Sequence, residues 1–234
     1  MPKVKNVFKW VNWVENEIYP WGGYTPTSNT IVYLPLNWTL DRYWTSSWTV
    51  EIWSDTPYED IYWNMQWIRF KWNSNSYVKI NSVPVMNTDF TLNFWALLYS
   101  NTDGMFVERW QSDATNRLLH YIIRGTTKVD LWFYSNDCAW NTNTSNWIWY
   151  NFCATYNATT KEMKTYINWT IDWTRTWSWT PDFWSGPLYL WWKHSYSTWN
   201  NVNWTMSKFI WEDKVWTLDE VLNHFNKTKK NYWF

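Results

Sequence analysis

The sequence predicts an all-β fold: a sandwich of two antiparallel sheets with one short helix near the C-terminus. Apolar and polar residues alternate with a period of two in many short runs, and Asn, Ser, Thr and Pro bound these runs. Only one segment has a helical pattern. The 234 residues fit one main core, because sandwiches commonly reach about 200–250 residues as one domain.

Eleven runs are predicted strands, because each places its apolar side chains on one face. In chain order they are residues 30–36, 68–70, 77–80, 90–99, 105–109, 117–124, 129–134, 149–156, 161–167, 188–190 and 205–211.

The predicted helix covers residues 218–225. Thr217 stands at its N-cap position and Glu220 follows three residues later. This spacing is that of a capping box, in which the two side chains bind each other's backbone N–H groups. The helix therefore begins at a defined residue and follows the last strand.

Tryptophan is far too frequent and glycine far too rare for an ordinary soluble chain. There are 28 Trp and five Gly residues, whereas glycine averages about 7%. Asn37-Trp38-Thr39, Asn168-Trp169-Thr170 and Asn203-Trp204-Thr205 would each be a hairpin signal if Trp were Gly, because an Asn-Gly turn needs φ > 0 at both residues.

We interpret many of these tryptophans as UGA codons that the source decodes as glycine, an alternative genetic code. The opposing interpretation is a truly Trp-rich protein, which would expose large rings in polar stretches such as 175–180. Four tryptophans lie in apolar alternating runs and are expected to be genuine, buried rings: Trp95, Trp149, Trp211 and Trp216.

Residues 1–28 differ in character from residues 29–234. A short apolar stretch and then a Pro/Gly-containing segment predict an N-terminal arm or hairpin with a linker. The alternative is an edge hairpin of the same sandwich. Residues 29–234 are the predicted sandwich domain.

Charge and composition exclude several classes of function. Twenty basic and twenty acidic residues give zero formal net charge without a basic block, so we expect no nucleic-acid partner. We also expect no membrane span and no signal peptide of its own. Of the two cysteines, Cys153 lies in a strand-like run and is expected to be buried, while a Cys138–Cys153 bridge stays open.

With glycine restored, the chain from about 29 to 226 resembles the laminin G-like, concanavalin A-like lectin/glucanase superfamily. The strands FTLNFW at 90–95 and WIWYNFCATY at 147–156 are the most specific matches. The others are IVYLPLNWTLD at 31–41, RFKWNSNSYVKI at 69–80, MKTYINW at 163–169, LYLWW at 188–192 and WTMSKF at 204–209. The resemblance implies a jelly roll of two antiparallel sheets.

The chain departs from the family where chemistry would lie. Tyr150 and Asn151 stand where histidines are usual, and Ser207-Lys208 replaces a common Asp-Glu pair. The Glu-x-Asp-x-x-Glu motif, which the glucanase branch uses as nucleophile and acid/base, is absent. We therefore expect a protein that is not an enzyme.

Metal binding has little support in the sequence. His120, His194 and His224 lie in unrelated segments without metal-ligand spacing. Many relatives bind Ca²⁺ through loop oxygens, so Ca²⁺ is conceivable here, but we assign no site and no cofactor. The loop oxygens that it would use are those of Asp103, Asp113, Asp137, Asn141 and Asn143, which we interpret as ordinary turn residues.

Sugar binding needs aromatic rings flanked by polar hydrogen-bonding groups. Two predicted loops have this mixture, and we name Tyr134, Asn136, Asp137, His194 and Tyr196 as candidate ligand-binding residues. The favoured function is a non-catalytic, lectin-like module that binds a glycan or surface polymer.

Residues 1–28 resemble the N-terminal segments of phage tail and virion proteins. This resemblance implies a module on a phage particle or bacterial surface, where the arm contacts other virion or surface proteins. A structural virion or surface decoration protein without a ligand is the alternative. A glycoside hydrolase ranks third.

Overall fold

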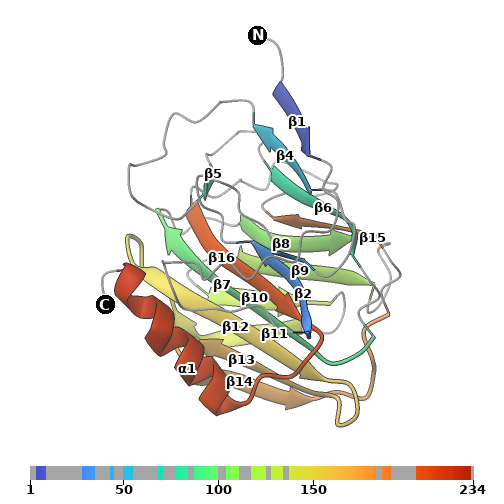
Figure 1. The fold of residues 1–234 in the computed structure, drawn as a ribbon. Helices are drawn as coiled ribbons and strands as arrows, with labels where there is room; N and C mark the ends of the chain where they lie inside the picture. Colours follow the sequence, from blue (N-terminus) through green and yellow to red (C-terminus); the bar gives the residue numbers. More distant parts are fainter. Residues whose placement is uncertain are drawn as a thin grey trace.

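Two antiparallel sheets form the protein, as the sequence predicts (Figure 1). The computed structural model describes residues 4–8, 28–34, 43–44, 50–54, 68–70, 77–83, 87–99, 104–110, 117–124, 128–133, 137–182, 186–190 and 204–232. The jelly-roll sandwich of the sequence analysis is confirmed.

The first sheet has eight strands in the order β1-β4-β6-β15-β8-β9-β10-β11. Their bounds in this order are Val4–Phe8, Val50–Ser54, Tyr77–Val83, Gly186–Leu190, Gly104–Trp110, Leu118–Arg124, Lys128–Trp132 and Asp137–Asn143.

The second sheet has the order β14-β13-β12-β7-β16-β2-β3, and β5 pairs with β16 beside this path. The bounds are Thr170–Thr176, Glu162–Ile167, Trp149–Asn157, Phe90–Leu98, Trp204–Glu212, Thr30–Leu34 and Tyr43–Trp44, with β5 at Ile68–Phe70.

All eleven predicted strands overlap observed ones, whereas β1, β3, β4, β11 and β14 were not predicted as strands. Four of these five strands end a sheet in the strand order: β1 and β11 in the first sheet, β3 and β14 in the second. An edge strand need not alternate, because it packs little of its surface; in β14 every residue is exposed or half-buried. Asp137, Asn141 and Asn143 thus lie in β11, and their assignment to loops was wrong.

The start of the predicted N-terminal arm pairs with the first sheet. β1 and β4 are antiparallel partners, from Val4 opposite Ser54 to Phe8 opposite Val50. Residues 9–27 lie outside the described residues. The division of the chain at residue 28 stays a prediction.

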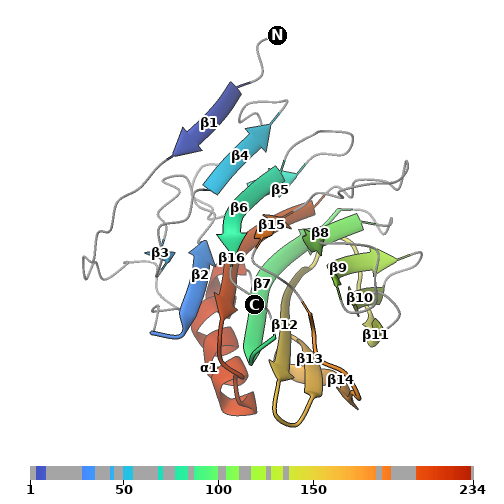
Figure 2. The ribbon, with the colours of Figure 1, turned by 90° about the vertical axis from the view of Figure 1, so that its right-hand side faces the viewer.

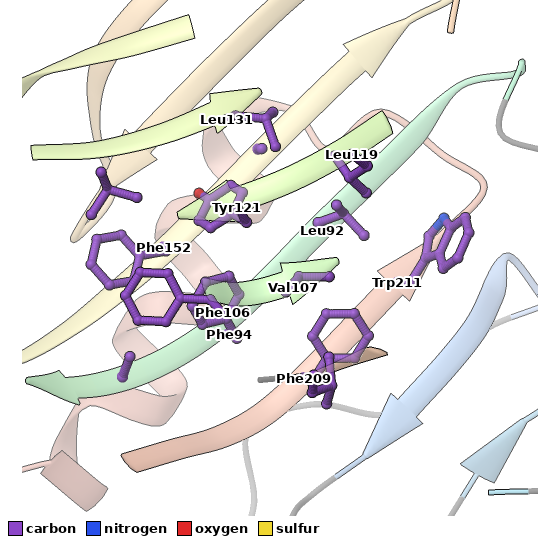
Figure 3. Packing of buried hydrophobic residues seen from close by; sticks show 14 of the residues in the cluster. Leu92, Phe94, Phe106, Val107, Leu119, Tyr121, Leu131, Phe152, Phe209 and Trp211 are labelled. Atoms are coloured by element: carbon purple, nitrogen blue, oxygen red, sulfur yellow. The ribbon is translucent and has the colours of Figure 1, made fainter. Parts of the chain in front are cut away.

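The apolar core lies between the sheets (Figure 3). Phe94 of β7 is near its centre, with ring centroids 5.4 Å from Phe106, 5.0 Å from Tyr121 and 5.5 Å from Phe152. Such aromatic pairs add about 0.5–1.5 kcal/mol each beyond the area they bury. Burial raises the pKa of Tyr121 well above its ordinary value. The alternation that predicted the strands therefore also identified the inward face.

Helix α1, Leu218–Thr228, covers the outer face of the second sheet, on the side away from the first (Figure 2). The predicted capping box is present: Thr217 Oγ1 accepts from Glu220 N at 3.3 Å, and Thr217 N donates to Glu220 Oε2 at 2.9 Å. A 3-10 turn, η1 at Lys229–Tyr232, continues the helix. Among the described residues, no helix is long and apolar enough to span a membrane.

Two tryptophans occupy backbone conformations that favour glycine. Asn168 and Trp169 have φ values of 48° and 70° between β13 and β14, and Trp147 has φ 66° before β12. Two successive residues with φ > 0 form the turn predicted for an Asn-Gly sequence. The prediction at Asn168-Trp169 is confirmed. At Asn203-Trp204 it was wrong in part, because Trp204 is the first residue of β16 and is fully buried.

The four rings expected to be genuine are all buried. Trp95 Nε1 donates to Thr228 Oγ1 at 3.1 Å, and Trp216 Nε1 donates to Glu212. Trp149 and Trp211 pack in apolar clusters. Trp177 is also buried, so the exposure expected for a Trp-rich 175–180 stretch was wrong at that residue.

Both cysteines are buried and free, so they form no bridge. Burial raises the pKa of the Cys153 thiol to about 12. Cys153 is thus the small buried residue that its strand pattern predicts.

Candidate functional site

The outer face of the first sheet carries polar groups directly behind the core. On β9, Leu119 and Tyr121 point into the core, so His120 between them lies on the opposite face. On β8, Val107 belongs to the core and the next residue, Glu108, lies on the outer face. The period of two therefore places an acid and an imidazole together outside the core.

Glu108 and His120 are cross-strand partners, and their side chains contact each other. His120 Nε2 lies 3.0 Å from Glu108 Oε1, at hydrogen-bond distance. The two side chains are only 1% and 7% exposed. Polar side chains buried this deeply need hydrogen-bond partners, and here each of the two side chains supplies one to the other.

The register extends this pair into a row across six adjacent strands, which we name the cross-strand row. Tyr189 of β15 lies opposite Glu108, and Lys79 of β6 lies opposite Tyr189. On the other side of the pair, Trp132 of β10 lies opposite His120 and Asp137 of β11 lies opposite Trp132. Strands are about 4.8 Å apart, so the row spans about 24 Å.

The row contains the kinds of group that bind sugars. Tyr189 and Lys79 are half-buried, while Glu108 and His120 form a fixed polar centre. A phenol ring packs against the apolar face of a sugar and an ammonium group donates to its hydroxyls, while the buried Glu108–His120 pair holds the centre of the row. The neighbouring Arg109 belongs to the other face: it donates from Nη2 to Val83 O at 3.1 Å, and burial lowers its pKa to about 10.

The predicted ligand-binding residues stand in different relations to this row. Asp137 holds the last register position of the row. Tyr134 and Asn136 fall outside the described residues, between β10 and β11, and so do His194 and Tyr196, which follow β15 in the chain. Their role in binding stays a prediction.

Glu108 and His120 were not predicted as site residues. His120 is a single polar residue in an apolar run, and Glu108 is followed directly by Arg109, so each has the local pattern of a solvated position. The available signal was the period of two: each residue follows a core position on its strand, and the two strands pair with each other. Only the register shows that the two residues face each other.

The described residues contain no cluster of three or more His, Cys, Asp or Glu side chains that could hold a metal ion. Asp103 and Asp113 fall outside the description. Asn141 lies instead in a polar link between the edge strands of the two sheets: its backbone N–H donates to Asp172 Oδ2 at 2.7 Å, and its Nδ2 donates to Asp172 O at 2.6 Å.

No family model matches the chain, and no curated protein matches it. Among solved structures, the chain is similar to the binding domain of botulinum neurotoxin serotype D/C, with TM-score 0.63 and 13% identity over 85% of this chain and 52% of that one. It is also similar to a structure of botulinum neurotoxin type C, whose cell entry depends on interaction with two ganglioside molecules. The TM-score there is 0.65, at 14% identity over 85% of this chain and 51% of the other.

A third similar structure is HCR/D-Sa-GBL1/C, with TM-score 0.67 and 14% identity over 85% of this chain and 51% of that one. The chain therefore spans about half the length of these structures. At this identity the likeness shows the fold alone, a β-sandwich.

Proposed function

We propose that the protein is a non-catalytic recognition module that binds a carbohydrate or surface polymer on the outer face of its first sheet. The observation that carries the proposal is the cross-strand row, with the buried Glu108–His120 pair at its centre and the Tyr189 ring beside it. A rigid sheet holds these groups in fixed register, so little ordering entropy opposes ligand binding.

The structural likeness supports the ligand class. The similar structures are described as binding or receptor-binding domains, and one of those toxins interacts with gangliosides, which are glycolipids. The likeness extends to half of those chains, so it supports the class of ligand and not the particular glycan.

The proposal is tested on a glycan array, followed by affinity measurements with variants. We expect Lys79→Met and Tyr189→Phe, which change the half-buried members of the row, to weaken binding of the best glycan about tenfold each, because one hydrogen bond contributes about 1–1.5 kcal/mol. Lys164→Met in β13 and Tyr99→Phe directly after β7 change the same residue types at the second sheet and are expected to bind normally. Equal affinity in all four variants would exclude this face as the site. An array with no ligand would favour the decoration protein.

We also propose that the source decodes UGA as glycine. The φ values of Trp147 and Trp169 support this, because a tryptophan at φ > 0 is strained whereas glycine is not. Peptide mass spectrometry of the protein from its source tests it: glycine at positions 147 and 169, with tryptophan at 95, is the expected result. Tryptophan at all three positions would refute the recoding.

The surface context is proposed together with the recoding. The module would stand on a phage particle or bacterial surface, with residues 1–28 in contact with its neighbours. The described part of this segment, β1, is the terminal strand in the order of its sheet, and a terminal strand suits the addition of a strand from a partner. Detection of the protein in purified particles tests this context, and its absence from them would refute it.

A further inference from the structure

A second group of polar residues lies on the opposite side of the molecule, between helix α1 and the second sheet. The interface there is mostly aromatic: Tyr232 stacks on Trp95 with ring centroids 4.1 Å apart, and Trp95 stacks on Phe225 at 5.4 Å. Lys208 of β16 and His224 of α1 are buried beside these rings, 2% and 5% exposed. A buried ammonium group in an apolar layer is costly and needs an explanation.

Lys208 is placed by a β-bulge. The register of β16 against β7 shifts between Ser207 and Ile210, and Lys208 adopts φ 51° there. A bulge turns an extra residue out of the normal alternation. The residue thus inserted on the helix side is a lysine, in a conformation that favours glycine.

The ammonium of Lys208 has no hydrogen-bond partner within the described part of the chain. Its nearest aromatic contact is the Tyr232 ring, with Nζ 5.7 Å from the centroid. A contact with a ring face offsets part of the desolvation of a cation but satisfies none of its three N–H donors.

The electrostatic surroundings are positive. Burial, and then the charge of Lys230, lower the pKa of Lys208 to about 8. Burial, and then the charges of Lys208 and Lys227, lower the pKa of His224 to about 3. The negative end of the helix dipole offsets only part of this positive charge, because it is worth about half an elementary charge.

We propose that Lys208 anchors a binding site for an oxyanion, a carboxylate or a sulfate, beneath the C-terminal end of α1. The anion would accept from Lys208 Nζ and stand near the hydroxyl pair of Tyr232 and Ser207, whose oxygens lie 2.9 Å apart. Access requires η1 to lift from the sheet, because the Tyr232 ring lies over the amine. The site lies on the second sheet and is independent of the cross-strand row.

The experiment titrates the protein with sodium sulfate and, separately, with sodium galacturonate, against sodium chloride at equal ionic strength, and measures affinity by calorimetry. We expect saturable binding to the wild type and at least tenfold weaker binding to Lys208→Met. Lys128→Met removes an exposed lysine on the first sheet and is expected to bind as the wild type does. Lys208→Met is expected to fold, because it replaces a buried charge without a partner by an apolar chain of similar length.

The two titrations separate the sources of the oxyanion. Binding of galacturonate alone identifies an acidic sugar, and binding of sulfate identifies an inorganic or sulfated group. If neither anion binds the wild type, or if Lys208→Met binds as tightly, the proposal is overturned. If sulfate raises the unfolding free energy of the wild type and of Lys208→Met equally, the proposal is also refuted, because a general salting-out effect needs no site.

Discussion

The turn between β13 and β14 allows a direct test of the interpretation that tryptophan stands where the backbone favours glycine. Trp169 has φ 70° and is 39% exposed, with its ring 4.2 Å from that of Phe225. Trp169→Gly and Trp169→Ala both remove that ring contact, so their difference in stability isolates the backbone. A left-handed conformation costs a residue with a Cβ about 1–2 kcal/mol, and glycine loses about 0.5–1 kcal/mol more chain entropy than alanine.

We therefore expect Trp169→Gly to be more stable than Trp169→Ala by about 0.5–1 kcal/mol, measured as urea midpoints at equal m-values. The matched control is Thr174 in β14, changed to glycine and to alanine, because this residue is exposed and has no positive φ. There the order should reverse, with alanine more stable than glycine by about 0.5–1 kcal/mol. If alanine is equal to or better than glycine at position 169 as well, the strain argument is wrong.

Three further outcomes follow from the described contacts. Thr217→Ala removes the capping box of α1 and should lower the unfolding free energy by about 1 kcal/mol in urea; an unchanged midpoint would show that the cap contributes nothing. His224 has a folded pKa of about 3 against 6.5 for the unfolded residue, so the unfolded chain takes up its proton first and stability falls as the pH drops from 6.5 to 3. His224→Leu should flatten this window in acid titrations, and an equally steep loss would contradict the shift. Asn93 and Asn151 exchange side-chain hydrogen bonds of 3.0 and 3.2 Å in a buried site; Asn151→Leu should cost about 1–3 kcal/mol, with Asn93→Leu in the same chain recovering part of it in a double-mutant cycle.

The sequence predicted the central strands because their core-facing apolar residues recur with a period of two. Phe90 to Leu98 alternates between the core and the helix-covered face, and its period of two was visible without coordinates. The helix was predicted for a local reason, since Thr217 and Glu220 satisfy each other's backbone groups. The edge strand β14 was not predicted, because a strand that buries little of its surface leaves no clear pattern.

The candidate site was less predictable, because it depends on register. Asp137 was named from its local composition; the register places it at the end of the cross-strand row, and its role in binding stays a prediction. Glu108 and His120 are 12 positions apart, and no local pattern links them. The bulge at Lys208 was equally hidden, since a lysine in an alternating run gives no sign that the chain gains an extra residue there.

By itself, the sequence determined the fold class, the inward faces of the main strands, the helix with its cap and one turn whose backbone favours glycine at Trp169. These features arise from residues near one another in the chain, whose spacing carries the physical cause. Only the tertiary structure decided which strands pair, that Glu108 faces His120 and that Lys208 is buried beneath α1. Register and layer packing decide these contacts, because they bring together side chains that no sequence spacing connects.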